Sequence, residues 1–276
     1  MIHSIEELHK KSYIYRKRFL DIFSAIGFGH LTTAFSSVEI LSVLYNEILT
    51  NPEAEFDNRE SDKVFISKGH GIGIIYPILE DLDILTNEQI SDSIKIGGDS
   101  SLIKNYVMPG FDFYGGSLGI GLGMAAGYAL GNKLTGIDYK TFCLCGDAEC
   151  YEGSIWEAVE FAGNYNLKNL IVIIDRNKLG CSDFTEHMLR LNPLKNKWEA
   201  FNWEVFECNG HDILNLYNTF EQAISSDKDS PKCIIANTQK GKGLDYLIDK
   251  PLMHGYMPKG DDIKIAYETL RNEYDE

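Results

Sequence analysis

The 276-residue sequence has no apolar run that approaches the roughly 20 residues needed to span a membrane. Its amino-terminal segment, MIHSIEELHKKSYIYRKRF, is charged throughout and lacks the apolar core of a signal peptide. It also contains no internal repeat, low-complexity tract or proline-rich linker. We therefore expect a cytoplasmic protein with no membrane partner, in which residues 1–276 form a single domain with an amino-terminal helix at about residues 4–26.

Positive charge is scarce as well. The 26 Lys and Arg residues are outnumbered by 41 Asp and Glu residues, and the formal net charge of −15 argues against nucleic acid as a partner. An anionic ligand would need local help from a metal ion and from backbone N–H groups. The six cysteines show no C-x-x-C pair and no zinc spacing. Small buried thiols in a reducing compartment are the expectation.

The sequence does contain a clear alternation of strand and helix patterns between residues 141 and 179. Residues 141–145 are apolar, residues 152–165 carry apolar side chains at helical spacing, and residues 170–174 are continuously apolar, as in a buried parallel strand. The 44% hydrophobic content is sufficient for one large core. These patterns predict an α/β fold, a three-layer α/β/α domain with a mainly parallel sheet.

Asp147 and Asn177 each follow one of these two strands and lie 30 residues apart, about the length of one βαβ unit. Parallel strands end at the same edge of a sheet, so both side chains are expected there, where open α/β sheets bind ligands. A carboxylate and an amide oxygen suit Mg²⁺ or Ca²⁺, and the remaining coordination positions suit a diphosphate. The alternative is structural: Asp147 caps a helix and Asn177 forms a turn.

The run GDAECYEGSIWEA followed by NLIVIIDRNKL resembles the thiamine diphosphate motif of transketolases, which reads GDG and, one βαβ unit later, Asn. The resemblance implies a thiamine diphosphate-binding fold in which Asp147, Asn177 and the main-chain carbonyl of Leu179 hold Mg²⁺ or Ca²⁺. It also implies that Gly146 and Ala148 lie against the cofactor. Ala148 departs from the motif, which has glycine there. Its methyl group is tolerated if the backbone needs no positive φ.

A glycine-rich segment, GGSLGIGLG at residues 115–123, is expected to open a helix. Glycine in a helix costs about 1 kcal/mol relative to alanine, so a reason for it is required. One reason is close approach of backbone N–H groups to a diphosphate, and another is tight packing on the sheet. In the transketolase resemblance, Gly116, Ser117 and Leu118 match the segment that contacts the cofactor.

Three histidines adjoin glycine where loops are expected: His30, His70 and His254. Each alone is more often structural than catalytic. Together they resemble the transketolase pattern, which implies that they lie near the reacting carbon and the diphosphate, with His70 and His254 contacting the cofactor. Histidine has a reference pKa near 6.5 and can give or take a proton at neutral pH.

Two parts of the transketolase pattern are missing. Residues 99–104, before Pro109-Gly110, contain no histidine where the family has one that touches the donor sugar. The activating glutamate of the family belongs to a second, pyrimidine-binding domain, and the resemblance covers only about residues 10–260. Glu152 resembles a family glutamate between paired active sites, or it is a first-turn carboxylate favoured by the helix dipole.

The resemblance therefore implies the amino-terminal subunit of a split transketolase, a ketol transferase for small ketose and aldose substrates. It would act with a separate carboxyl-terminal subunit, with two copies of each in the assembly. Two alternatives stay open: a subunit of another thiamine diphosphate enzyme (a 2-oxo acid decarboxylase or a 1-deoxyxylulose-phosphate-synthase-like enzyme), or a non-catalytic partner subunit.

Local signals make further predictions. Capping boxes are expected at Ser36–Glu39 and at Thr86, and an N-cap is expected at Asp212. His211 is assigned to a structural turn. The remaining histidines are expected at the surface: His3, His9 and His187.

Overall fold

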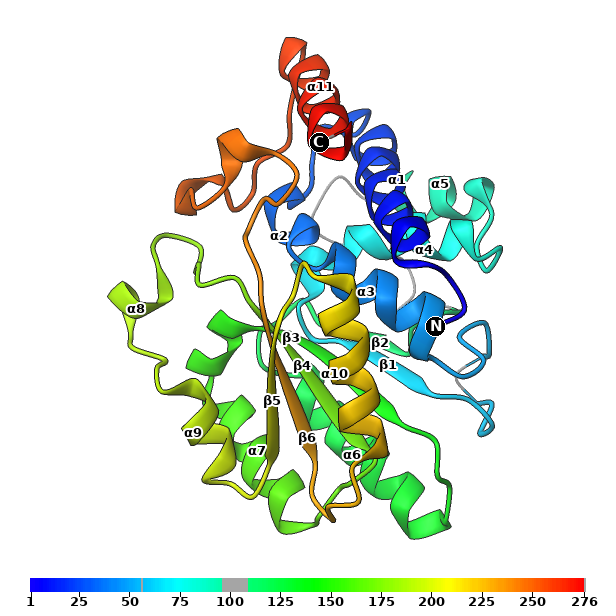
Figure 1. Ribbon diagram of the computed structural model, residues 1–276, viewed down its shortest axis with the longest axis vertical. Coiled ribbons are helices and arrows are strands. Elements are labelled where there is room, and N and C mark those ends of the chain that lie inside the picture. The colour runs from blue at the N-terminus through cyan, green and yellow to red at the C-terminus, as the bar shows by residue number, and fades with distance from the viewer. Residues whose placement is uncertain (56, 96–108, 276) are drawn as a thin grey trace.

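The computed structural model describes residues 1–55, 57–95 and 109–275 (Figure 1). Its centre is a six-stranded sheet in which every pair of neighbouring strands is parallel. The strands lie in the order β2 (Phe113–Tyr114), β1 (Lys63–Ile66), β3 (Thr141–Gly146), β4 (Leu170–Arg176), β6 (Lys232–Asn237) and β5 (Glu204–Asn209). The prediction of a mainly parallel sheet is confirmed.

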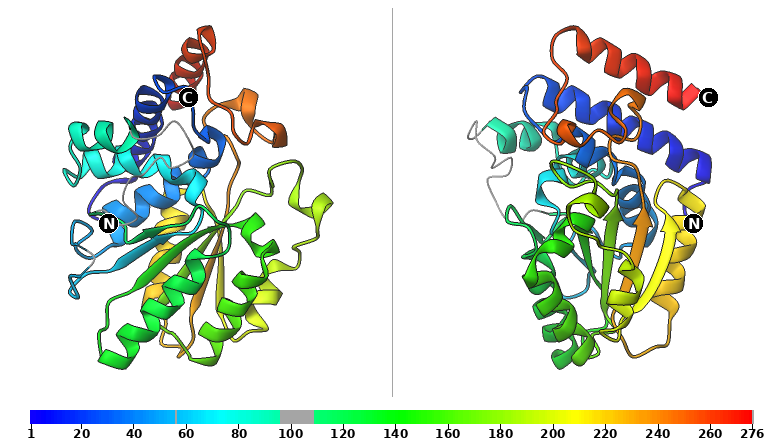
Figure 2. Two further views of the ribbon diagram at one scale, coloured as in Figure 1. Left: turned by 180° about the vertical axis from the view of Figure 1, so that it is seen from behind. Right: turned by 90° about the vertical axis from the view of Figure 1, so that its left-hand side faces the viewer.

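Helices cover both faces of this sheet, which gives the predicted three layers (Figures 1 and 2). The core on one face joins the sheet to α1 (Ile5–Ser24), α3 (Val38–Val43), α4 (Ile75–Asp81) and α10 (Ile213–Ser225). The core on the other face joins it to α6 (Gly121–Thr135), α7 (Gly153–Asn164) and α9 (Leu194–Glu199).

The central strands are apolar along their length because both of their faces are covered. In β3, Phe142 and Leu144 belong to the first core, whereas Cys143 and Cys145 belong to the second. Successive side chains of a strand point to opposite faces, so each of the two cores receives every second residue. This explains why residues 170–174 are continuously apolar.

The amino-terminal helix is confirmed, and Ser4 and Glu7 form a capping box at its start. The box at Thr86 is also confirmed, since its hydroxyl accepts from the Gln89 N–H. The box at Ser36 is wrong. Helix α3 begins one residue later, after Ser37, without a side-chain cap, and Glu39 is drawn instead to Arg16. A buried ion pair with a guanidinium has displaced the local cap.

The other helical segments are short, apart from α5 and α11. They are α2 (Leu31–Phe35), η1 (Leu44–Ile48), η2 (Gly69–Ile74), α5 (Asn87–Lys95), η3 (Asp147–Tyr151), α8 (Thr185–Met188), η4 (Asp245–Leu247), η5 (Pro251–Met253) and α11 (Asp261–Asp275). The last helix, α11, packs along α1 above the carboxyl ends of the strands (Figures 1 and 2). The rings of Tyr13 and Tyr274 stack between them with centroids 4.5 Å apart.

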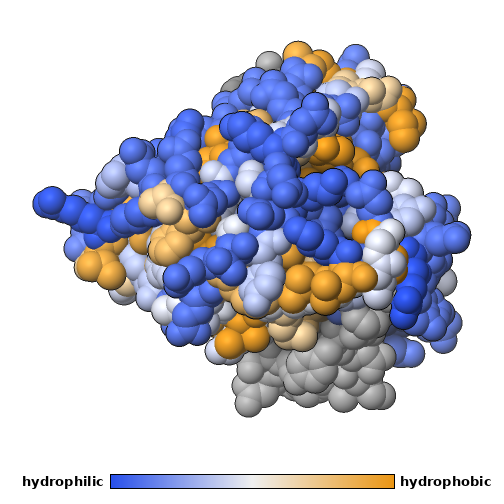
Figure 3. Space-filling view, turned by 90° about the horizontal axis from the view of Figure 1, so that it is seen from below, coloured by the Kyte–Doolittle hydropathy of each residue, from blue (hydrophilic) through white to orange (hydrophobic). Residues whose placement is uncertain are grey.

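The surface fits the composition. From below, the molecule is mostly hydrophilic, with hydrophobic residues in small separate groups (Figure 3). Among the helices that the structure describes, none is both long and apolar enough to cross a membrane.

Candidate active site

A cavity of about 540 Å³ lies where β1, β3 and β4 end, bounded also by residues of the α2 and 240–254 regions. The predicted site residues gather here. His30, His70, His254, Gly116, Leu118, Gly146, Asp147, Ala148, Asn177 and Leu179 all line the cavity. Ser117 and Glu152 are not among the residues that line it; both are exposed beside it.

Asp147 and Asn177 come together because β3 and β4 are neighbours in parallel register, with Gly146 opposite Asp175. The Asp147 carboxylate is buried. Its Oδ2 accepts from Arg176 Nη1 at 2.9 Å and from the Lys178 N–H at 2.7 Å. Burial raises the pKa of Asp147 to about 6, although the Arg176 guanidinium opposes the shift. A carboxylate held in this state gains from a nearby cation.

The loop after β4 turns sharply at Lys178, which has φ of 64°. A side chain other than glycine adopts this left-handed conformation only when surrounding bonds hold it there. Here the Lys178 N–H binds Asp147, and the Asn177 Oδ1 accepts from the Leu179 N–H at 3.1 Å. The turn brings Asn177 and Leu179 to the same cavity.

Two glycines of the site are required by geometry. A Cβ on Gly69 would lie 1.6 Å from the carbonyl oxygen of Gly115, so the two loops approach too closely for any side chain. Gly119 has φ of +80°, and a Cβ there would lie 2.7 Å from the Cβ of Glu152. By contrast, a Cβ on Gly116 would meet nothing within 4 Å. The space beside Gly116 opens into the cavity and leaves its backbone accessible to a ligand.

Ala148 lies in the single-turn helix η3 and is not among the non-glycine residues with positive φ. The backbone therefore accepts alanine at the position where the transketolase motif has glycine.

The three predicted histidines form one cluster. The ring centroids of His30 and His254 are 5.2 Å apart, those of His70 and His254 are 5.0 Å apart, and those of His30 and His70 are 5.6 Å apart. Burial, and then nearby ammonium groups, lower the pKa of His70 to about 2 and that of His254 to about 3. Burial also lowers the pKa of His30. These shifts favour the neutral form of all three rings at pH 7.

One ring nitrogen of this cluster lacks a partner. The Nδ1 of His30 is buried and has no hydrogen-bond partner among the described residues. Such a nitrogen costs free energy unless a ligand or water satisfies it.

Two lysines of the cavity were not predicted from the sequence. Lys68 is fully buried and forms an ion pair with Asp175, while it also donates to the Thr33 carbonyl at 2.7 Å. Lys240 is 3% exposed and donates from Nζ to His254 Nδ1 at 2.8 Å and to the Gly180 carbonyl at 3.2 Å. Burial and Lys68 lower the pKa of Lys240 to about 8, so its ammonium lacks a full counter-charge. Neither role has a sequence signal beyond the KGKG run.

Glu149 was missed too. Its buried carboxylate accepts from Ser67 Oγ at 2.5 Å, from the Gly119 N–H at 2.9 Å and from the Gly146 N–H at 2.8 Å. It thereby joins the loop after β1, the glycine-rich segment and the loop after β3. The three-residue spacing between Gly146 and Glu149 was the one available signal, since a glutamate three residues after the N-cap can accept from the N-cap N–H, which is one half of a capping box.

The residues fit an anionic cofactor held with a divalent cation. Two buried ammonium groups and an accessible glycine backbone surround the cavity, and the oxygens of Asp147, Asn177 and Leu179 belong to one loop pair. Within residues 1–55, 57–95 and 109–275, no group of three or more His, Cys, Asp or Glu side chains could together hold a metal. A cation here would rest on one carboxylate and neutral oxygens, so it needs further ligands from the bound anion.

A family profile described as transketolase, thiamine diphosphate binding domain, matches residues 10–275. The chain belongs to the transketolase family. It is a transferase of that family, and the fold predicted from the resemblance is the one observed.

Two relatives match the chain along almost their whole length. The A subunit of apulose-4-phosphate transketolase from Actinobacillus succinogenes is 40% identical over 98% of each chain. The protein of the same name from Phocaeicola vulgatus is 32% identical, over 96% of this chain and 94% of its own. The chain covers only 39% of rat transketolase, to which it is 35% identical.

Among solved structures, transketolase from Campylobacter jejuni superposes with a TM-score of 0.84 over 97% of this chain and 42% of its own, at 28% identity. The sequence thus matches relatives named as one subunit of a transketolase over nearly their full length, and it matches a longer transketolase over less than half. Residues 99–104, where the family histidine is missing, lie outside the residues that the structure describes.

Proposed function

We propose that this chain is the diphosphate-binding subunit of a split transketolase and transfers a ketol group only together with a separate pyrimidine-domain subunit. The observation that carries the proposal is the gathering of Asp147, Asn177 and three neutral histidines in one cavity. The chain that forms this cavity matches two transketolase A subunits along nearly their whole length. The residues 1–276 then form one domain.

In this proposal Asp147, Asn177 and the Leu179 carbonyl hold Mg²⁺ or Ca²⁺, which binds the diphosphate of thiamine diphosphate. The ammonium groups of Lys68 and Lys240 add positive charge around the cavity, which a protein of net charge −15 otherwise lacks. Backbone groups of Gly116, Leu118, Gly146 and Ala148 line the remaining wall, with Ser117 at its edge.

Thiamine diphosphate, when bound, supplies the electron sink for cleavage and formation of a carbon–carbon bond. The chain's own task is to place the substrate and move protons. His30, His70 and His254 are neutral, and a neutral imidazole can take a proton from a substrate hydroxyl or return it. His254 receives a hydrogen bond from Lys240 at Nδ1, which leaves its proton on Nε2.

The partner subunit would cover the carboxyl edge of the sheet, exclude water and supply the activating glutamate of the pyrimidine-binding domain. Two copies of each subunit would form the assembly. Glu152, exposed next to Gly119, would then face a neighbouring active site. We place the protein in the cytoplasm, because its free cysteines, five of six buried, suit a reducing compartment.

The names of the two full-length relatives motivate apulose 4-phosphate as a candidate donor. A rival is another thiamine diphosphate chemistry, such as decarboxylation of a 2-oxo acid, which is motivated by the missing histidine in residues 99–104. A non-catalytic role rested on Ala148 alone, and the backbone at Ala148 accommodates its methyl group.

The test combines binding and turnover in the reconstituted pair of subunits. Calorimetry with thiamine diphosphate and Mg²⁺ should give saturable binding, and Ca²⁺ in place of Mg²⁺ tests the choice of metal. Assays with apulose 4-phosphate, other ketose phosphates and pyruvate then separate ketol transfer from decarboxylation. Binding without turnover of any ketose would contradict the proposal, and so would turnover of pyruvate alone.

A further inference from the structure

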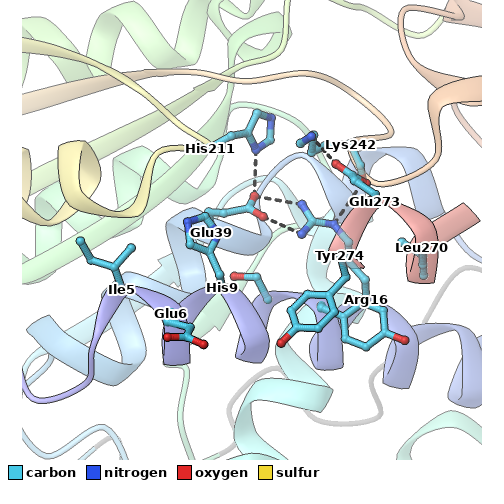
Figure 4. A pocket seen from close by; sticks show the side chains of 12 residues that line it. Ile5, Glu6, His9, Arg16, Glu39, His211, Lys242, Leu270, Glu273 and Tyr274 are labelled. Carbon is cyan, nitrogen blue, oxygen red and sulfur yellow. Dashed lines mark hydrogen bonds and ion pairs between the residues drawn. The ribbon is translucent and has the colours of Figure 1, made fainter. Parts of the chain in front are cut away.

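Three charged or polar side chains form a network on the wall of a second cavity, separate from the active-site cavity (Figure 4). Arg16 in α1 contacts Glu39 in α3 through two hydrogen bonds, at 2.5 Å from Nη1 and 2.9 Å from Nη2. Glu39 Oε2 also lies 2.8 Å from Nδ1 of His211, in the turn before α10. Burial alone would raise the pKa of Glu39, but Arg16 and His211 more than offset this, and the pKa lies well below its usual value.

The tautomer of His211 follows from its neighbours. Its Nε2 lies 2.8 Å from the Gln239 backbone nitrogen, which can only donate. Nε2 is therefore the acceptor, and the ring proton is on Nδ1, from which it is donated to the Glu39 carboxylate. His211 thus connects a buried carboxylate to the backbone of the loop after β6.

Arg16 binds the other end of the same loop. Its Nε donates to the carbonyl of Lys242 at 3.1 Å. The loop residues 239–242 are consequently held at both ends by a single carboxylate-centred network, and between them the Gly241 N–H donates to the Thr32 carbonyl at 2.9 Å.

Lys240 lies between the two anchored positions. Its side chain extends into the active-site cavity, where Nζ donates to His254 Nδ1 and to the Gly180 carbonyl. A buried ammonium on a flexible four-carbon side chain needs a fixed backbone to remain in one place.

The cavity that these three side chains line does not account for the network as a ligand-binding site. That cavity, of about 890 Å³, is lined by α1, α11 and the network itself. Its charged network groups are already paired, Arg16 with Glu39 and Lys242 with Glu273, so they are not left to define a ligand.

We propose that Arg16, Glu39 and His211 are positioning residues that fix the loop 239–242 and thereby hold the Lys240 ammonium at the cofactor site. The inference rests on the proposed function in one respect, namely that the cavity takes an anionic cofactor. The sequence predicts only a structural turn at His211. In this proposal His211 also fixes the loop that carries Lys240.

Two variants of His211 separate the two bonds of the ring. In His211→Asn the amide can still donate to Glu39 from the position of Nδ1, but the acceptor for Gln239 is lost. In His211→Gln an oxygen can occupy the position of Nε2 and accept from Gln239. Hydrogen exchange of the full-length chain without cofactor should be about five- to tenfold faster in the Gln239–Lys242 segment of His211→Asn than in His211→Gln or wild type.

Cofactor binding supplies the second readout, in the complex with the partner subunit. Thiamine diphosphate with Mg²⁺ should bind about tenfold more weakly to His211→Asn, as with other residues that position ligating groups. In a Lys240→Ala background the same substitution should add little, because the tether acts through Lys240. His9→Ala is the matched control. His9 is an exposed histidine that lines the same 890 Å³ cavity as the network, and it makes none of the network's hydrogen bonds.

The outcomes are distinguishable. Unchanged exchange in His211→Asn would overturn the tether, as would additive effects of His211→Asn and Lys240→Ala on cofactor affinity. If wild type bound no thiamine diphosphate in the complex, the proposed function would fail together with the role of Lys240, whatever the exchange data show. Faster exchange, weaker binding and non-additivity together support the proposal, and recovery in His211→Gln excludes a general loss of folding.

Discussion

The Arg176 guanidinium lies 2.9 Å from the carboxylate of Asp147, the residue proposed to bind the metal. Arg176 also contacts Glu186 at 2.8 Å and Thr185 Oγ1 at 3.0 Å, so it keeps partners if Asp147 is lost. Arg176 therefore serves as the counter-ion of the buried Asp147 carboxylate, which can still bind a metal ion.

Asp147→Ala should therefore abolish cofactor binding without unfolding the chain. We expect the melting temperature of the free subunit to stay within a few degrees of wild type, because burial raises the pKa of Asp147 and its charge is held at a cost. The increase in melting temperature on adding thiamine diphosphate and Mg²⁺ to the complex should vanish. Asp138→Asn, at a highly exposed carboxylate outside the cavity, is the control and should retain that increase.

Stability should fall as the pH drops below 6.5 because the partly buried active-site histidines have lowered pKa values. The pKa of His70 is about 2 in the folded chain and near 6.5 when unfolded, so the unfolded state binds more protons between these values. The contribution of the neutral His70 ring to the free energy of unfolding is fully present above pH 6.5. It decreases by about 1.4 kcal/mol per pH unit as the pH falls toward 2. Denaturant titrations of wild type and His70→Asn between pH 5 and 8 check the slope. Equal slopes would contradict a His70 ring that stays neutral in the folded chain.

Breaking the Lys68–Asp175 pair should be costly, because Asp175 is fully buried. Lys68→Met leaves an uncompensated carboxylate and should lower the free energy of unfolding by about 3–5 kcal/mol. The double variant Lys68→Met/Asp175→Asn should recover part of this, since Ser36 and Thr238 still hydrogen-bond at the position of Asp175. Chemical denaturation of the free subunit measures both, and a double variant as unstable as the single one would refute the explanation.

Gly119 and Gly131 should respond to alanine with opposite signs. Gly119→Ala places a Cβ at φ of +80° and 2.7 Å from Glu152, so we expect a loss of about 1–3 kcal/mol and weaker cofactor binding. Gly131→Ala, within α6 and with open space around the new methyl group, should gain up to about 1 kcal/mol in the free subunit. Thermal melts of both variants test the pair.

The sheet and the loops that carry Asp147 and Asn177 could be predicted because their signals are local. The apolar run from Leu170 to Ile174, the helical spacing after Glu152 and the polar residues Asp147 and Asn177 all lie within one βαβ unit. Strand period and chain order are enough to place both oxygens at one edge of a parallel sheet.

The supporting residues could not be predicted, because their partners are distant in sequence. Lys68 pairs with Asp175, which is 107 residues away, and Glu39 contacts His211, which is 172 residues away. Ser36 shows the competition directly. Its hydroxyl bonds Asp175 Oδ2 at 2.6 Å rather than capping a helix. A tertiary contact outweighed a local motif there, and no pattern in the surrounding residues signals it.

The buried Glu149 carboxylate receives hydrogen bonds from Ser67 in the loop after β1, from Gly119 in the glycine-rich segment and from Gly146 at the end of its own strand β3. The loop after β1 and the glycine-rich segment are consequently not expected to change length independently, since an insertion in either would move a donor away from the shared acceptor. A change in substrate preference is then expected to arise from residues of the cavity wall that do not bond to Glu149. In a library for altered specificity, randomising Ser67 or Gly119 should yield mostly inactive clones, because Ser67 donates to Glu149 through its side chain and Gly119 has a positive φ. Diversity is better placed at residues that do not bond to Glu149.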